Sequence, residues 1–172
     1  MFKFCIKRKE PIYFNEYFDN KNIKIKVIDV YDGDTITAII PFYFRKFKFK
    51  CRLYNFDSPE KKPSLKNNDR EYEKYCAEIS KFALSEKIMN KKIKCKTYKL
   101  DKYGRLLIEL FDNNNNSINE YMLNNNCGYQ YSGKTKQNIN YLDNGYFILN
   151  NNKYQISQDI INRYKLSLIN KN

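Results

Sequence analysis

Residues 22–40 read NIKIKVIDVYDGDTITAII, two runs rich in β-branched residues on either side of a short acidic turn. Valine, isoleucine and threonine favour strands, so Asn22–Val30 and Thr35–Ile40 predict the two arms of a β-hairpin. Asp32-Gly33 predicts the turn, because glycine supplies the positive φ that tight hairpin turns require. This part of the chain is therefore expected to be a pair of antiparallel strands.

A further strand and a helix are predicted after the hairpin. Phe42–Phe56 alternates aromatic with basic residues, which is the period of a half-buried strand. Pro59 ends it, because proline cannot donate to a β-ladder. Apolar residues then recur at helical spacing, from a predicted N-cap at Asp69 to a stop at Asn90.

A second strand pair and a second helix follow. Lys92–Leu100 and Arg105–Phe111 predict strands around the turn Asp101–Gly104, and Ser117 opens a capping box for a helix that ends near Gly128. The order β-β-β-α-β-β-α is typical of a five-stranded, OB-like barrel with two or three packed helices. We therefore expect an α+β fold that is mainly a β-barrel.

The length of 172 residues suits one compact domain with a modest extension. We expect residues 1–22 to be an N-terminal leader and residues 23–134 to form the barrel domain. Residues 135–172 are expected to be a polar extension with one helix at Ser157–Leu168, because Asn is abundant there and apolar residues share one helical face only in that segment.

Cysteine usage points to a reducing compartment, and hydropathy gives no sign of a membrane-spanning segment. The five cysteines are odd in number, and no pair has the spacing of a zinc site, so they are expected to be reduced thiols. No apolar run approaches the ~20 residues that cross a bilayer. Met1–Glu10 lacks the apolar core of a secretory signal. We expect an intracellular, monomeric protein with no membrane partner.

The chain carries a net charge of +13 and no histidine. The positive charge favours a polyanionic partner such as nucleic acid, although abundant Asn, Lys, Ile and Tyr also fit the codon bias of an A/T-rich genome. The absence of histidine excludes nuclease mechanisms with a histidine base or metal ligand. Any hydrolysis must therefore use carboxylates, lysine, tyrosine, arginine and a metal.

Acidic clusters and arginines alternate along the middle of the chain. Asp34 precedes Arg52, the cluster Asp57-Ser58-Pro59-Glu60 follows, and Arg105 closes the series. Carboxylates bind a hard divalent cation through oxygen, and arginine binds phosphate through paired N–H donors. A site with both groups has the parts needed to cut a phosphodiester, which predicts a metal-dependent nuclease.

Four elements in order carry a resemblance to a known family. They are Val30-Tyr31-Asp32-Gly33-Asp34-Thr35, Cys51-Arg52-Leu53, Asp57-Ser58-Pro59-Glu60 and Asp101-Lys102-Tyr103-Gly104-Arg105. With these motifs, the segment Lys24–Lys134 resembles the staphylococcal nuclease (thermonuclease) family. The resemblance implies a Ca²⁺ site made by Asp34, Asp57 and the backbone carbonyl of Ser58, where the family usually has threonine.

The resemblance also implies roles in catalysis and substrate binding. Arg52 and Arg105 would clamp the scissile phosphate, at the site rather than in the core, and Glu60 would orient or deprotonate the attacking water. The product would be a 3′-phosphate of DNA or RNA. The residues implied in substrate binding are Lys102, Tyr103, Tyr129, Tyr131 and Lys134.

Other readings of these residues are open. Asp34 alone would also fit turn capping, which is common in Asp-Gly loops, and Asp32 fits turn stabilisation. Glu60-Lys61-Lys62 has the carboxylate-x-lysine spacing of restriction-endonuclease-type folds, but Pro59 opposes a regular strand there. A nuclease-like OB domain without catalysis, which simply binds nucleic acid, is the second alternative. Retention of both arginines and all three principal acids argues against it.

Overall fold

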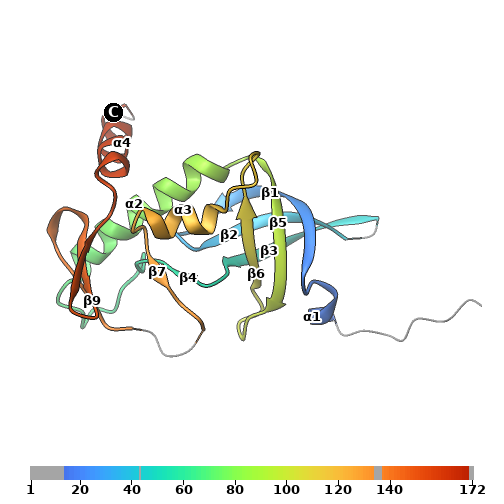
Figure 1. The fold of residues 1–172 in the computed structure, drawn as a ribbon, viewed down its shortest axis with the longest axis horizontal. Coiled ribbons are helices and arrows are strands. Elements are labelled where there is room, and N and C mark those ends of the chain that lie inside the picture. The colour runs from blue at the N-terminus through green and yellow to red at the C-terminus, as the bar shows by residue number, and fades with distance from the viewer. Residues whose placement is uncertain (1–13, 43, 134–136, 171–172) are drawn as a thin grey trace, which may run out of the picture.

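The protein is described by a computed structural model over residues 14–42, 44–133 and 137–170 (Figure 1). Its centre is a closed barrel with the strand order β1-β2-β3-β6-β5. The strands are β1 (Lys21–Val30), β2 (Thr35–Phe42), β3 (Arg45–Leu53), β5 (Lys92–Leu100) and β6 (Leu106–Phe111). The α+β, OB-like barrel predicted from the sequence is therefore confirmed.

Period-two alternation decides which side chains fill the barrel. β1 and β2 form the predicted hairpin, β1 closes the barrel against β5, and β3 runs parallel to β6. Along β3, Cys51 and Leu53 are buried in the core. Arg52, between them, therefore points to the opposite face, as the alternation predicted.

Two helices pack against the barrel, α2 (Arg70–Ile88) and α3 (Ile118–Asn124), whereas α4 (Gln158–Ile169) packs against α2. A single turn, α1 (Phe14–Tyr17), precedes β1. The Ser117 side chain caps α3 by accepting a hydrogen bond from the Glu120 amide, as predicted. Asp69 occupies the N-cap position of α2 but makes no side-chain cap hydrogen bond. The position of that helix start was predicted correctly, and the capping interaction was not.

The role predicted for Gly33 is wrong. Its φ is not positive, whereas Gly104, in the turn between β5 and β6, has a φ of 79°. Gly33 is required for a different reason, because a Cβ there would lie 2.7 Å from the Ser58 Cβ and 2.8 Å from the Ser80 Cβ. The glycine allows the turn between β1 and β2 to pack directly against the loop after β4 (Phe56–Asp57) and against α2.

The half-buried strand predicted over Phe42–Phe56 is only partly right. Phe44 is fully exposed at 103% and Phe47 is 43% exposed. The β2–β3 hairpin extends away from the barrel at this end (Figure 1), so these rings have no core to enter. The alternation becomes an inside–outside pattern only where β3 joins the closed barrel.

The C-terminal region holds more structure than the sequence predicted. The expected helix is α4, but a three-stranded sheet of β8 (Ile139–Tyr141), β9 (Tyr146–Leu149) and β10 (Asn152–Gln155) precedes it, with a 3₁₀ turn η1 (Asp143–Gly145) after β8. This sheet lies at the opposite end of the molecule from the β2–β3 hairpin tip (Figure 1). Its strands are only three or four residues long and are separated by polar turns, which gives no strand-length pattern, and it was therefore missed.

Two further sequence-based expectations concern thiols and membranes. Cys51, Cys76, Cys95 and Cys127 are buried free thiols, as expected for reduced cysteines, and Cys5 lies outside the described residues. Among the residues that the structure describes, no helix is both long enough and apolar enough to cross a bilayer.

Candidate active site

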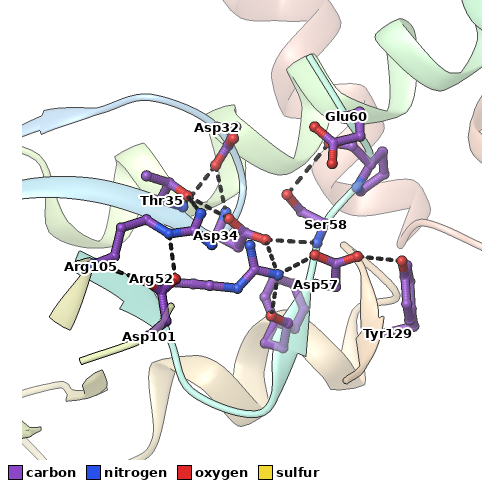
Figure 2. A network of polar contacts seen from close by, with 12 residues as sticks. Asp32, Asp34, Thr35, Arg52, Asp57, Ser58, Glu60, Asp101, Arg105 and Tyr129 are labelled. Carbon is purple, nitrogen blue, oxygen red and sulfur yellow. Dashed lines mark hydrogen bonds and ion pairs between the residues drawn. The ribbon is translucent and has the colours of Figure 1, made fainter. Parts of the chain in front are cut away.

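The turn between β1 and β2 presents Asp34 to the site. Asp32 holds this turn, because its Oδ1 accepts hydrogen bonds from the backbone amides of Asp34 at 3.1 Å and Thr35 at 2.7 Å. Asp34 itself accepts a hydrogen bond from the Thr35 hydroxyl at 2.7 Å. Asp32 is thus the turn-capping residue, and the Asp34 carboxylate is left to face the neighbouring strands (Figure 2).

Arg52 lies between Asp34 and Asp57 (Figure 2). Its Nη2 is 2.9 Å from Asp34 Oδ2 and also forms an ion pair with Asp57 Oδ1. The same nitrogen donates to the Phe56 carbonyl at 3.2 Å. The arginine side chain is 13% exposed and the two carboxylates are 5% and 6% exposed. We call Asp34, Arg52 and Asp57 the buried triad.

Asp57 is fixed from behind by the segment after α3. β4 pairs antiparallel with β7 (Tyr129–Gln130), with Asp57 opposite Tyr129, and the Tyr129 hydroxyl donates to Asp57 Oδ2. Gly128 is essential to this approach, because a Cβ there would lie 2.2 Å from the Asp57 backbone oxygen. The hydrogen bond leaves Asp57 Oδ1 directed toward Arg52.

The loop after β4 carries Glu60 and is tied to two elements. The Ser58 amide donates to Asp34 Oδ2 at 3.3 Å, and the Glu60 amide donates to Glu73 Oε1 at 3.1 Å. Glu73, on α2, also accepts a hydrogen bond from Asn67 at 2.7 Å. Ser58 is buried, whereas Glu60 is exposed. The backbone is therefore anchored while the Glu60 carboxylate reaches solvent and the pocket.

The Glu60–Lys62 segment is a loop rather than a strand. A restriction-endonuclease-type core needs this glutamate and lysine on a regular strand of its central sheet. The loop geometry therefore excludes the restriction-endonuclease-type fold. The presence of Pro59, which opposes a regular strand, had suggested the same conclusion.

Arg105 stands at the opposite wall, on the turn between β5 and β6. Asp101 Oδ1 accepts from the backbone amides of Tyr103 and Arg105 at 2.8 and 2.9 Å. Its Oδ2 accepts from Arg105 Nε at 2.7 Å, and Arg105 Nη1 donates to the Thr35 hydroxyl at 3.4 Å. Thr35 therefore joins the two turns (Figure 2). We call Asp101, Tyr103 and Arg105 the turn cluster.

A pocket of about 760 Å³ opens between the buried triad and the turn cluster. Side chains from four separate segments line it: Arg52, Asp57, Glu60, Lys102, Tyr103, Arg105 and Tyr131. Tyr103 is 71% exposed at the rim, and the Arg52 guanidinium carbon lies 5.7 Å from the centre of the Tyr131 ring. The pocket thus combines cationic groups with aromatic rings, which suits a phosphate joined to a base.

Burial dominates the electrostatics of the triad. It raises the pKa of Asp34 from 3.8 to about 8, against the lowering effect of Arg52 and with additional upward contributions from Asp32 and Asp57. Burial alone would lower the pKa of Arg52. The negative charges of Asp34 and Asp57 together outweigh this effect and raise the pKa above its ordinary value, so the guanidinium stays charged. One cation is therefore insufficient to keep Asp34 fully ionised at neutral pH.

Comparison with known proteins identifies the family. The family model described as "Staphylococcal nuclease homologue" matches residues 50–145, which is more than half of the chain. This protein belongs to the staphylococcal nuclease homologue family. The match spans Arg52, Asp57, Glu60 and Arg105, and it ends within the C-terminal sheet region before β9. No match was found among curated proteins. For a staphylococcal nuclease homologue, a nuclease-like or nucleic-acid-binding role follows.

Two carboxylates of this staphylococcal nuclease homologue lie close enough together to share one cation. The described residues hold no cluster of three or more His, Cys, Asp or Glu side chains arranged for a metal. Asp34 and Asp57 nevertheless direct one carboxylate oxygen each at a single cation, the Arg52 guanidinium. Two carboxylates completed by backbone carbonyl and water are a donor set that Ca²⁺ accepts, because it tolerates irregular oxygen coordination.

Most of the site residues predicted from the sequence lie close together in the structure. Asp34, Arg52, Asp57, Ser58, Glu60 and Arg105 surround one end of the barrel, and Lys102, Tyr103 and Tyr131 line the same pocket. Tyr129 lies behind Asp57 instead of lining this pocket. Lys134 lies outside the described residues.

Sequence reasoning missed two residues that position this site. Thr35 bridges Asp34 and Arg105 through its hydroxyl. Glu73 is a buried carboxylate that holds the Glu60 loop. A signal for Glu73 was present, because it precedes the buried Cys76 and Ala77 by three and four residues on the core face of α2.

Proposed function

We propose that this protein is a calcium-dependent nuclease that hydrolyses phosphodiester bonds of DNA or RNA and leaves 3′-phosphate products. The observation that carries the proposal is the convergence of Arg52, Glu60 and Arg105 on one pocket beside two buried aspartates. Paired guanidinium groups next to an acidic cation site match the charge that develops on phosphorus during hydrolysis. Membership of the nuclease homologue family supports the same activity.

The charge balance of the triad supports a divalent cation. When ionised, Asp34 and Asp57 together carry two negative charges against one positive charge on Arg52, and Asp32 adds a third carboxylate nearby. Asp34, Asp57 and the carbonyl of Ser58 would hold Ca²⁺, which would supply Lewis-acid stabilisation of the phosphate oxygens. A bound cation would also favour the ionised form of Asp34.

The side chains divide the chemistry between them. Glu60 orients a water molecule or takes its proton as the water oxygen bonds to phosphorus. The bond from phosphorus to the 5′ oxygen breaks, and this oxygen takes a proton from solvent, which leaves a 3′-phosphate. Arg52 and Arg105 hold the equatorial oxygens, whose negative charge is greatest in the five-coordinate state.

One assay tests the proposal directly. Purified protein is incubated with single-stranded DNA, double-stranded DNA and RNA, each with Ca²⁺, Mg²⁺ or EDTA. We expect cleavage with Ca²⁺, preference for unpaired strands, 3′-phosphate ends and no cleavage in EDTA. Full activity in EDTA would remove Asp34 and Asp57 as metal ligands, and products with 5′-phosphates would contradict the proposed bond cleavage.

A non-catalytic nucleic-acid-binding module is the second candidate. The contact that favours it is the ion pairing of Arg52 with both aspartates, which places an arginine where a nuclease would use a metal. Glu60→Gln separates the two functions, because it keeps the size of the side chain and removes its charge. In a nuclease it should lower turnover at least about 10²-fold. In a binding module, wild type shows no cleavage and the substitution leaves affinity unchanged.

A further inference from the structure

A second pocket adjoins the catalytic pocket on the far side of Tyr131. It has a volume of about 520 Å³. Asn55, Tyr131 and Ser132 line both pockets. Because the two pockets share these residues, a ligand that runs along the protein surface can extend from one pocket into the other. A strand of nucleic acid is such a ligand.

The second pocket is lined by neutral amides and aromatic rings. Its amide side chains are Asn55, Asn126, Gln130, Gln137 and Asn150, and its aromatic side chains are Tyr129, Tyr131, Phe147 and Tyr154. Among the described residues, none that lines it is charged, in contrast to the catalytic pocket. Phosphate is recognised by Lys and Arg. This lining therefore suits the base of a nucleotide better than its phosphate.

Several of these groups are held in place. The rings of Phe147 and Tyr154, on β9 and β10, are stacked with centroids 5.4 Å apart and planes 18° apart. Asn126 donates to the Gln155 carbonyl at 2.9 Å, which ties the end of α3 to β10. The side-chain amide of Asn55 has no hydrogen-bond partner among the described residues and can therefore bind the polar edge of a base.

The second pocket is also fixed relative to the reacting centre. Tyr129 lines it and donates its hydroxyl to Asp57 Oδ2, on the catalytic side. The other wall comes from β9 and β10, beyond the segment matched by the family model. The C-terminal sheet thus adds a wall to a site whose catalytic half belongs to the family.

We propose that this second pocket binds one nucleobase of the substrate strand, adjacent to the nucleotide in the catalytic pocket. The proposal rests on the proposed binding of nucleic acid. It gives the C-terminal sheet a function, because Tyr154, held by the buried ring of Phe147, then contributes to substrate affinity. Binding there extends recognition to a neighbouring nucleotide and leaves the groups that contact the phosphate unchanged.

Oligonucleotide length and base removal test the proposal on the intact chain. Labelled oligothymidylates and oligouridylates of increasing length are bound to the Glu60→Gln protein with Ca²⁺, and affinity is measured by fluorescence anisotropy. We expect one added nucleotide to raise affinity on the order of tenfold, the effect of stacking a single base. An abasic sugar-phosphate at that position should abolish the increase.

A matched pair of variants locates the effect. Tyr154→Leu removes the ring while keeping an apolar side chain, and it should abolish the increase without changing the affinity of the shorter oligonucleotide. Tyr146→Leu is the control, because Tyr146 belongs to the same sheet but does not line the pocket. It should leave the increase intact. Melting curves verify folding, and the abasic comparison needs only the Glu60→Gln background.

The outcomes separate this inference from the proposed function. Affinity that rises evenly with length, with abasic and normal oligonucleotides equal, would overturn the base-binding pocket while leaving nucleic-acid binding intact. An increase that survives in a folded Tyr154→Leu protein would also overturn it. Failure of every oligonucleotide to bind would overturn the proposed function and this inference together.

Discussion

The buried triad and the turn cluster both pair arginine with aspartate, but they do so in different surroundings. Arg52 is 13% exposed between two nearly inaccessible carboxylates, whereas Arg105 is 23% exposed beside an Asp101 that is 14% exposed. Burial raises the pKa of Asp34, while hydrogen bonds in an open turn lower the pKa of Asp101. The arginine of the buried triad is therefore expected to affect the stability of the fold, whereas the arginine of the turn cluster is expected to affect mainly ligand binding.

The largest difference between the two regions should appear on removal of each arginine. Arg52→Ala and Arg105→Ala should each lower turnover on the order of 10²–10³-fold, because each removes a donor to the transition state. Only Arg52→Ala should also destabilise the fold, by about 3 kcal/mol, because it leaves two buried carboxylates without their cation. Kinetics with Ca²⁺ measure the loss of turnover, and denaturant unfolding of the metal-free proteins measures the loss of stability.

The sequence predicted that both arginines lie at the site rather than in the core, so neither was expected to affect folding. The burial of Arg52 changes this expectation for that residue. Arg105→Ala is the control, since loss of a partly exposed pair should change the free energy of unfolding by less than about 1 kcal/mol. Equal stability of the two variants would contradict the distinction between the regions.

Each region contains a glycine, and the two are required for different reasons. Gly33→Ala places a Cβ 2.7 Å from Ser58 Cβ and should destabilise the fold by about 1–3 kcal/mol through overpacking. Gly104→Ala meets no atom within 4 Å and should cost only about 1 kcal/mol, because its φ is +79°. Unfolding in denaturant compares them, and a smaller loss for Gly33→Ala would refute the close-packing argument.

The two regions should also respond to pH in opposite directions. The pKa of Asp34 is raised from 3.8 to about 8 in the folded protein, so folding takes up protons within that window. The contribution of Asp34 to stability is therefore complete at low pH and is lost as pH rises toward 8. The pKa of Asp101 is lowered, although burial opposes this, by hydrogen bonds from Arg105 and Tyr103. Its contribution is present above 3.8 and is lost in acid.

Melting temperatures of metal-free protein from about pH 2 to about pH 9 test these signs. Asp34→Asn should remove the decline at the alkaline end, and Asp101→Asn should reduce the loss at the acid end. Ca²⁺ should raise the melting temperature more at the alkaline end, where Asp34 ionises most readily. A decline that persists unchanged in Asp34→Asn would assign it to another group.

The smallest expected effect concerns the support behind the triad. Tyr129→Phe removes the hydroxyl that donates to Asp57 and should lower stability by about 1 kcal/mol, the usual contribution of one hydrogen bond. Turnover should fall modestly, because Asp57 loses one orienting contact. Tyr164→Phe is a matched control, because the Tyr164 hydroxyl donates to Glu78 Oε2 at 2.6 Å and Tyr164 does not line the catalytic pocket; it should lower stability without changing turnover. An effect of Tyr129→Phe as large as that of Arg52→Ala would place Tyr129 among the groups that contact substrate.

Local patterns were sufficient to predict the barrel. β-Branched runs gave β1 and β2, period-two alternation gave the inside of β3, and helical spacing gave α2. Prediction failed where long-range packing decides the outcome. The C-terminal strands β8, β9 and β10 are three or four residues long, too short to show a period-two pattern. Their stability comes from packing as a sheet, which is absent from any local pattern.

The sequence by itself determined which chemical groups this protein has. It supplies aspartates, arginines and Glu60 in order, excludes histidine chemistry, and carries the motifs of a nuclease family. Only the tertiary structure decided which role each of these groups has. It places Arg52 between Asp34 and Asp57, uses Tyr129 to hold Asp57, and adds a second pocket beside the catalytic one. The physical reason is burial, because the pKa and the role of a carboxylate depend on how much water and which cation surround it.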